Sequence, residues 1–191
     1  KHILKVGADN GLESHIDSYL HTSEECQNWQ KSMPLITPKA LYDYKNSYPK
    51  YNKQQVDEAI NSLGFLFSEG QTLFHGGLFD DVGEYLTNKP LSVSFCPQVA
   101  LRNAEWAGKA YDRGRIDIFV LKSTSPSTHV YFYNLNEELG NEKEVLFASG
   151  AKLKFIRRTK VLDDYHVGKI NFNLQEFEKN IPVYVVEAEI S

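Results

Sequence analysis

Apolar residues recur at helical spacing in the first third of the chain. Within residues 52–63, Val56, Ile60 and Leu63 fall at positions i, i+4 and i+7 among polar residues, and Gly64 follows. This spacing puts the three side chains on one face of a helix that Gly64 can end. Two earlier helices are expected on the same grounds, over residues 14–29 and beginning after Thr37-Pro38.

After Gly70 the pattern changes to short runs rich in β-branched and aromatic residues, separated by Gly, Pro, Asn and Asp. Such runs predict strands. One helix interrupts them, from Pro97 to about Ala110, with proline in its first turn and Gly108 weakening its end. The expected strands cover residues 72–74, 91–94, 116–122, 130–133, 144–148, 152–160, 169–173 and 183–190.

Helices first and mostly strands later, without regular strand–helix alternation, favour an α+β fold with a largely antiparallel sheet. The chain has 191 residues, of which 41% are hydrophobic, so it is long enough to bury a core. We expect a helical region at 1–63 that packs on a strand-rich core at 64–191, the two forming one structural domain.

The charge balance narrows the class of partner. The chain carries 21 Lys and Arg against 25 Asp and Glu and has no basic block, so sequence-independent binding of nucleic acid is not expected. Apolar runs such as 118–121 are far shorter than the ~20 residues of a membrane-spanning helix. Cys26 and Cys96 alone cannot form a four-ligand zinc site, and no histidine spacing indicates a metal.

The first segment with candidate chemistry is a strand that ends in His75 and continues into Gly76-Gly77. Glycine lets a ligand approach the backbone, and a histidine at a strand end can form hydrogen bonds with a ribose or a phosphate. The glycine spacing matches neither the dinucleotide-binding fingerprint nor the P-loop. A partly buried histidine before a glycine turn is the structural alternative.

The second segment is Ser92-Val93-Ser94. Because side chains alternate along a strand, the two serines project from one side and Val93 from the other, just before a helix. The structural alternative is that one serine caps that helix and the other is exposed.

The third segment holds Glu142 and Glu144, which share one face ahead of an apolar Val-Leu-Phe run. A pair of carboxylates at this spacing also occurs at ordinary solvated strand ends. Beside an apolar strand, however, two carboxylates can stabilise a cationic transition state, since charge stabilisation is strong where water is excluded.

Together these segments resemble the mono-ADP-ribosyltransferases of the bacterial-toxin type. The resemblance runs over about residues 71–161 and includes Phe74-His75-Gly76, the Ser-x-Ser strand, and Glu-x-Glu-Val-Leu-Phe followed by Ser-Gly-x-Lys-Leu-Lys-Phe. The last motif is the most specific, and Ser92 precedes Glu144 by 52 residues. The resemblance implies an ADP-ribosyltransferase-like fold: two small, mostly antiparallel sheets around an NAD cleft, with N-terminal helices.

The resemblance also implies roles for the site residues. Glu144 would stabilise positive charge as nicotinamide leaves the ribose of NAD, and Ser92 would hold Glu144 and that ribose in place. Glu142 would orient the guanidinium of an acceptor arginine, whose fork fits a carboxylate. Besides Ser92, the residues implied to bind NAD are His75, Gly76, Ser94 and Phe95, with Ser94 also stabilising the strand. No metal is implied.

His75 departs from the toxin pattern. Members with both Ser-x-Ser and Glu-x-Glu usually carry arginine at this place, and histidine is typical of the diphtheria-like branch. A histidine that is neutral near pH 7 offers less charge to NAD. The candidates for a compensating cation are Arg102, Lys109, Arg113 and Arg115.

Three further segments have expected uses in the structure. We expect 79–85 to form a lid near NAD, Trp106 to lie in the core, and 131–133 to serve core packing rather than substrate recognition.

The alternatives to protein modification are an NAD glycohydrolase, a nucleic-acid acceptor, which the acidic charge disfavours, and a non-catalytic binding module on the same fold. The partners expected from the resemblance are a target protein and a cognate immunity protein covering the cleft, with no membrane. The chain starts at Lys1 and its one methionine is Met33. Taken with this start, the resemblance implies a monomeric passenger segment of a longer secreted or delivered effector, which acts in the target-cell cytoplasm.

Overall fold

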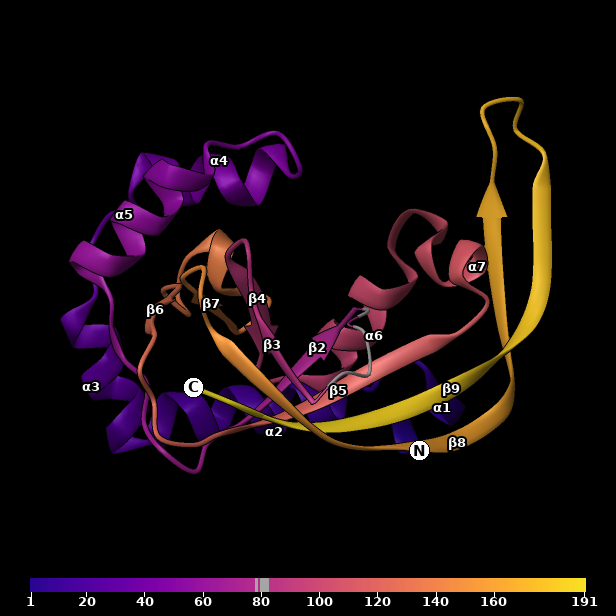
Figure 1. Cartoon of the computed structure of the whole chain (residues 1–191), viewed down its shortest axis with the longest axis horizontal. Coiled ribbons are helices and arrows are strands. Elements are labelled where there is room, and N and C mark those ends of the chain that lie inside the picture. Colours follow the sequence, from indigo (N-terminus) through magenta and orange to yellow (C-terminus); the bar gives the residue numbers. More distant parts are fainter. Residues whose placement is uncertain (78, 80–82) are drawn as a thin grey trace.

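The computed structural model describes residues 1–77, 79 and 83–191. Residues 1–63 form helices, as predicted (Figure 1). The expected helix over 14–29 is two helices, because the Ser23 hydroxyl accepts a hydrogen bond from the N–H of Cys26 and begins a new helix there. The helices are α1 (His2–Val6), α2 (Asn10–Thr22), α3 (Glu24–Ser32), α4 (Lys39–Ser47) and α5 (Lys53–Leu63).

The strands begin directly after α5. Two short ones, β1 and β3, were not predicted. The predicted strand at 152–160 is part of the single long β8, which ends at Ile170, so most of the strand predicted at 169–173 lies in the connection to β9. The strands are β1 (Phe65–Leu66), β2 (Thr72–Gly76), β3 (Glu84–Leu86), β4 (Leu91–Ser94), β5 (Ile116–Ser123), β6 (His129–Phe132), β7 (Glu144–Phe147), β8 (Lys152–Ile170) and β9 (Glu176–Ile190).

The helix expected from Pro97 to Ala110 is shorter than predicted. It ends as α6 (Pro97–Glu105), because Ala107 and Gly108 take positive φ angles of 54° and 74°, and α7 (Lys109–Arg113) follows. The expectation that Trp106 lies in the core is wrong: its side chain is 70% exposed, since it sits in the kink rather than on the buried face of α6.

The described strands form one hydrogen-bonded sheet in the order β1-β6-β7-β4-β2-β5-β9-β8-β3. Every neighbouring pair is antiparallel except β5 and β9, which confirms the predicted α+β class. A single residue pair, Phe74 with Ser94, joins β2 to β4. The sheet therefore consists of two halves that meet at this seam, where two separate small sheets were expected.

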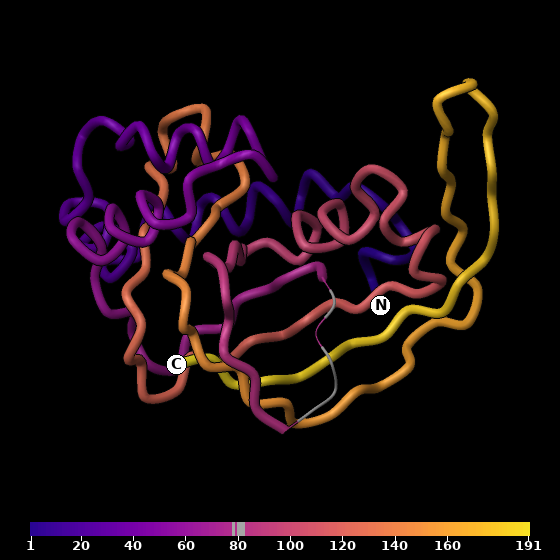
Figure 2. Tube along the Cα trace, turned by 45° about the horizontal axis from the view of Figure 1, so that its top comes forward, coloured from indigo at the N-terminus to yellow at the C-terminus, as the bar shows by residue number. Residues whose placement is uncertain are grey.

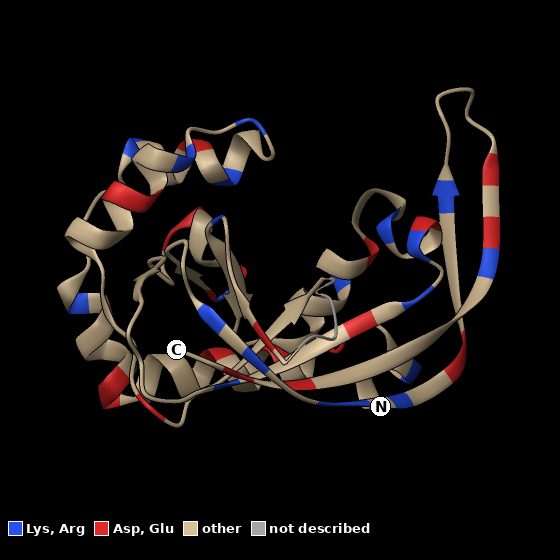
Figure 3. Cartoon of the chain, in the orientation of Figure 1, with Lys and Arg blue, Asp and Glu red and all other residues tan. Residues whose placement is uncertain are grey.

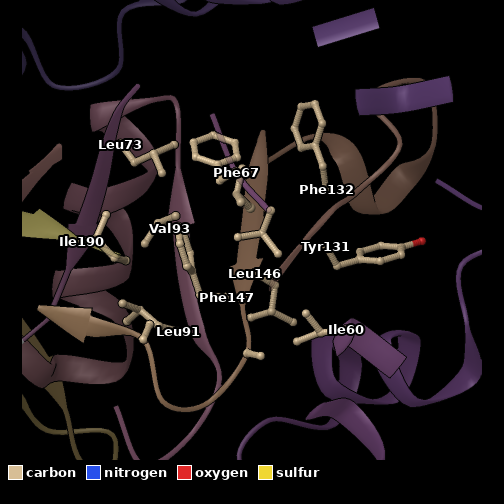
Figure 4. Close-up of a cluster of buried hydrophobic side chains, with 14 of the residues drawn as sticks. Ile60, Phe67, Leu73, Leu91, Val93, Tyr131, Phe132, Leu146, Phe147 and Ile190 are labelled. Atoms are coloured by element: carbon tan, nitrogen blue, oxygen red, sulfur yellow. The ribbon is translucent and has the colours of Figure 1, made fainter. Parts of the chain in front are cut away.

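Helices α2 to α5 pack on the β1-β6-β7-β4 half, and their apolar side chains join the same core cluster as the strands. Trp29 of α3 stacks with Phe65 and Phe95, at centroid distances of 6.0 Å each. Figure 4 shows Ile60 of α5 beside Tyr131 and Leu146 in this cluster. A second cluster lies between α6, α7 and the other half of the sheet.

Strands β8 and β9 form a hairpin whose far end projects beyond the rest of the described chain (Figures 1 and 2). Basic residues of β8 lie beside acidic residues of β9 (Figure 3), as in the pair Arg157–Glu187 at 2.7 Å. At the base of the projecting part, Val167 and Ile181 are buried in the second cluster, whereas Phe172 and Leu174 at the tip are exposed.

Candidate active site

The predicted site residues meet at the seam between the halves of the sheet. Glu144 begins β7 directly opposite Ser94 of β4, and Ser92 lies opposite Leu146. Since directly opposed residues of an antiparallel pair share a face, the two serines and Glu144 project from the same side of the sheet, as the alternation predicts. The structure therefore brings together the Ser-x-Ser and Glu-x-Glu motifs.

The carboxylates of Glu142 and Glu144 converge on a residue that the sequence did not single out. The ammonium of Lys45, from α4, forms an ion pair with Oε2 of each glutamate. The side chain of Glu144 is only 2% exposed, that of Lys45 14%, and that of Glu142 36%. Burial acts to lower the pKa of Lys45, but the two carboxylates outweigh it and the net shift is upward. The cluster therefore holds a charged lysine at neutral pH.

Tyrosines surround this ionic cluster. The Nζ atom of Lys45 lies 5.5 Å from the ring centroid of Tyr133, and the Tyr133 hydroxyl donates to the Leu41 carbonyl oxygen of α4 at 3.2 Å. Burial, and then the charge of Glu144, raise the pKa of Tyr133 and of Tyr44. Tyr131 to Tyr133 are buried, which confirms their predicted place in the core. Tyr133 in addition forms one wall around the glutamates.

Lys143 sets the path of the chain between the two glutamates. Its φ of 51° lies in the left-handed region, which is costly for a residue with a Cβ. Its ammonium is held by two acidic side chains of α2, Glu13 at 3.2 Å and Asp17 at 3.0 Å. Helix α2 thus anchors the turn from which Glu142 reaches Lys45.

The two serines have different surroundings. The Ser94 hydroxyl donates to the backbone carbonyl of Glu142 at 2.6 Å and accepts from the N–H of Cys96 at 2.9 Å. Ser94 therefore fixes the backbone of the glutamate segment, in agreement with its expected structural role. Ser92 is half-buried, and its carbonyl oxygen is bonded to the ring of His75.

The ring of His75 has a defined tautomer when it is neutral. Its Nδ1 lies 2.7 Å from the Ser92 carbonyl oxygen, and because a carbonyl can only accept, Nδ1 carries the hydrogen and Nε2 is an acceptor. Burial lowers the pKa of His75 to about 4, opposed by the bond to Ser92 and helped by the positive charges of Lys109 and Lys89. His75 is therefore neutral at pH 7.

The four cations expected to compensate for His75 have different surroundings. Lys109 acts electrostatically on His75, and so does Lys89, which the sequence did not indicate. Arg115 is engaged with Asp117 at 3.0 Å. Arg102 and Arg113 are exposed on α6 and α7.

Gly76 ends β2 under α6. A Cβ at this position would lie 1.8 Å from the carbonyl oxygen of Ala100, so the close approach of α6 to β2 requires glycine. The described structure explains Gly76 by packing, and its expected contact with NAD stays a prediction.

The ring of Phe95 packs in the aromatic cluster, 6.0 Å from Trp29 and 5.8 Å from Phe132. Its backbone N–H donates to the carbonyl oxygen of Lys143 at 3.2 Å, so the residue lies next to the glutamate segment. Its expected contact with the cofactor stays a prediction.

The lid expected at 79–85 lies partly outside the described residues, which leave out 80–82. Phe79 itself contacts the ring of His75, with centroids 5.4 Å apart.

In the described ranges, no group of three or more His, Cys, Asp or Glu residues is arranged to hold a metal ion. No helix among the described residues has the length and apolar character needed to cross a membrane.

No protein-family model matches the sequence. A search of curated proteins also gives no match.

Among solved structures, the chain is similar to the Vis toxin, an ADP-ribosyltransferase from Vibrio splendidus, at 14% identity over 98% of this chain and 76% of that chain, with a TM-score of 0.44. It is also similar to the ADP-ribosylating toxin BECa of C. perfringens, solved with NADH, at 12% identity over 93% and 48% of the two chains, with a TM-score of 0.49. The C3larvin toxin of Paenibacillus larvae, another ADP-ribosyltransferase, gives 10% identity over 100% and 92%, with a TM-score of 0.40.

Proposed function

We propose that this chain is a toxin-type mono-ADP-ribosyltransferase, which cleaves NAD between nicotinamide and ribose and transfers ADP-ribose to an arginine of a target protein. One observation carries the proposal: the carboxylates of Glu142 and Glu144 converge on a single cation, beside the Ser92–Ser94 strand. A site built in this way favours positive charge, and positive charge develops on the ribose in this reaction.

The residues at the seam fit the hydroxyl groups of NAD. The Ser92 hydroxyl can donate or accept, and the Nε2 of neutral His75 can accept from a ribose hydroxyl. Neutral His75 cannot neutralise a phosphate, so the proposal needs a cation for the two phosphates, and Lys109 and Lys89 are candidates because their charges help to lower the pKa of His75. When bound, NAD supplies the leaving group and the electrophilic ribose carbon.

Glu144 has the surroundings that its proposed role needs. A carboxylate in a water-poor site stabilises a developing cation far more than one in water does, and that stabilisation is larger in the transition state than in the ground state. Glu142, which is more exposed, is placed to accept a hydrogen-bonding fork from an incoming guanidinium. Ser94 and Lys143 hold the backbone between the two carboxylates in position.

The partners belong to the same proposal. The net charge of −4 favours a protein acceptor over a nucleic acid, whose phosphates it would repel. A target protein, an immunity protein covering the site, and action as a delivered monomeric effector in the target-cell cytoplasm follow from the resemblance of the motifs to toxin-type enzymes.

The experiment measures nicotinamide release and the transfer of labelled ADP-ribose to lysate proteins in parallel. We expect Glu144→Gln to lower both by about 10²-fold or more, because a charge that stabilises the transition state is lost. We expect Glu142→Gln to keep release to water but to lose protein labelling. Glu138→Gln, an exposed glutamate on the same connection, is the matched control and should change neither.

A wild-type chain that releases no nicotinamide and labels no protein would contradict the proposal. Release without labelling would favour a glycohydrolase, and binding of NAD in a calorimeter without release would favour a non-catalytic module. The modified residue, mapped by mass spectrometry, tests the assignment of arginine.

A further inference from the structure

Glu144 is buried, and Lys45 is part of what covers it. A carboxylate whose side chain is 2% exposed has little surface to offer a substrate. The ammonium of Lys45 lies against Oε2 of both Glu144 and Glu142 and reaches this place from α4, about 100 residues earlier in the chain. In the structure as it stands, both glutamates are therefore already paired with one cation of the chain itself.

The place that this ammonium occupies has the composition of a cation-binding site. Two carboxylate oxygens accept from it, and the face of the Tyr133 ring lies 5.5 Å from Nζ. Carboxylates combined with an aromatic face bind guanidinium as well as ammonium groups. An acceptor guanidinium on Glu142 would need the same oxygen that Lys45 now holds.

A resident ammonium also opposes the chemistry proposed for this site. Two positive charges held close together in a water-poor site repel each other more strongly than they would in water. A lysine that stays on Glu144 would place such a charge beside the ribose as it becomes cationic. The productive arrangement therefore favours a site from which Lys45 has withdrawn, which its flexible four-carbon stem allows.

We propose that Lys45 is a built-in competitor for the acceptor cation: it fills the place between Glu142, Glu144 and Tyr133 and leaves when a guanidinium group binds. This inference rests on the proposed function, since it concerns how that same site admits its acceptor. The ligand class is a small guanidinium or alkylammonium cation. Such a ligand can bind only while Lys45 is away from the glutamates. Its apparent affinity is therefore its intrinsic affinity multiplied by the fraction of time for which the site is open.

Calorimetry with methylguanidinium, in the absence of NAD, tests the competition. We expect Lys45→Gln to bind the probe at least about tenfold more tightly than wild type, as follows if Lys45 is seated nine-tenths of the time. Lys39→Gln is the matched control, because Lys39 lies on the same helix, is exposed and pairs with Asp43. It should bind like wild type. Equal or weaker binding by Lys45→Gln, or no binding by either protein, would overturn the proposal.

A second measurement needs no variant, and so it holds even if Lys45→Gln does not fold. Acetylation of wild-type lysines by acetic anhydride, read by mass spectrometry, reports how accessible each amine is. We expect saturating methylguanidinium to raise the labelling of Lys45 several-fold and to leave Lys39 unchanged. Labelling of Lys45 that stays constant or falls would show that the probe does not displace it, and the proposal would be wrong.

Neither measurement uses NAD, so the two proposals fail separately. Displacement of Lys45 in a chain that releases no nicotinamide would contradict the transferase and support the cation site. Nicotinamide release from a chain in which methylguanidinium leaves Lys45 seated would support the transferase and overturn the competition.

Discussion

His75 shows how one hydrogen bond decides the chemistry available to a side chain. The hydrogen bond from its Nδ1 to the Ser92 carbonyl uses the one N–H group of the neutral ring. Where the motif pattern usually has the donor and charge of an arginine, this chain offers an acceptor. The positive charges of Lys109 and Lys89 help to lower the pKa of His75.

The pKa of His75 leads to a prediction about stability. The native-state pKa is about 4 and the ordinary value about 6.5, so between these pH values the unfolded chain binds a proton that the native chain does not. The native state with neutral His75 therefore becomes less stable as the pH falls. The contribution of His75 to the free energy of unfolding is fully present above about pH 6.5 and is lost as the pH falls toward 4. We expect wild type to lose about 3 kcal/mol more than His75→Asn over this range.

Urea unfolding at several pH values measures this difference. His15→Asn, at an exposed histidine of α2, should follow the wild-type curve. Parallel curves for wild type and His75→Asn would contradict the prediction.

Lys143 allows the cost of its backbone conformation to be measured separately from its charge. Both Lys143→Ala and Lys143→Gly remove the ion pairs with Glu13 and Asp17, but only alanine keeps a Cβ at the φ of 51°. We expect the glycine variant to be more stable than the alanine variant by about 1 kcal/mol, measured by thermal unfolding. An alanine variant as stable as the glycine variant would mean that this turn carries no strain.

At this scale the sequence predicts what lies close along the chain. The shared face of Ser92, Ser94 and Glu144 follows from alternation and from strand pairing. The contact with Lys45 does not, because it depends on how α4 packs over β7, and nothing near Lys45 in the sequence marks it.

Among the elements, the seam between β2 and β4 is held close to α6 by Gly76. A Cβ there would overlap the backbone of Ala100 and come within 2.8 Å of the nitrogen of Ala104, neither of which can move aside as a flexible side chain could. We expect Gly76→Ala to lower the free energy of unfolding by about 3 kcal/mol.

Chemical denaturation measures this loss, with Gly168→Ala as the matched control. Gly168 also lies in a strand, but a Cβ there would meet only the Phe177 carbonyl oxygen at an ordinary 3.7 Å. The control should stay within about 0.5 kcal/mol of wild type. Equal effects of the two substitutions would show that α6 does not press on β2.

The elements themselves follow from the sequence wherever one apolar pattern runs without interruption. Helix α5 is an example, since Val56 and Ile60 are buried as its spacing predicts, whereas Leu63 in its last turn is 41% exposed. The errors lie where a local interaction overrides the pattern. The hydroxyl of Ser23 begins a new helix inside the expected one, and the positive φ of Ala107 ends α6 before Trp106 can be buried.

For the whole molecule, the helical region and the sheet share one core. Helices α2 to α5 contribute several nearly fully buried apolar side chains to the cluster that contains the strands, among them Leu20, Leu41, Val56 and Ile60. At about 1.5–3 kcal/mol for each buried side chain, these four alone amount to about 6–12 kcal/mol. That is comparable with the whole stability of a typical domain.

We therefore expect a fragment of residues 64–191 to lack a cooperative thermal transition, measured by circular dichroism. The full chain carrying Phe172→Ser, at the exposed hairpin tip, should melt like wild type. A fragment that melts cooperatively would show that 64–191 folds independently.

The placement of the two tryptophans makes the chain its own spectroscopic probe. Trp29 of α3 is 8% exposed and stacks on Phe95, directly after Ser94 at the end of β4, whereas Trp106 is 70% exposed. A collisional quencher such as acrylamide reaches an exposed indole freely and a buried one poorly, so replacing Trp106 with phenylalanine leaves an emission dominated by the helix–sheet interface. The wavelength and quenching of that emission would follow any separation of the helices from the glutamate-bearing strands in real time, without an attached dye.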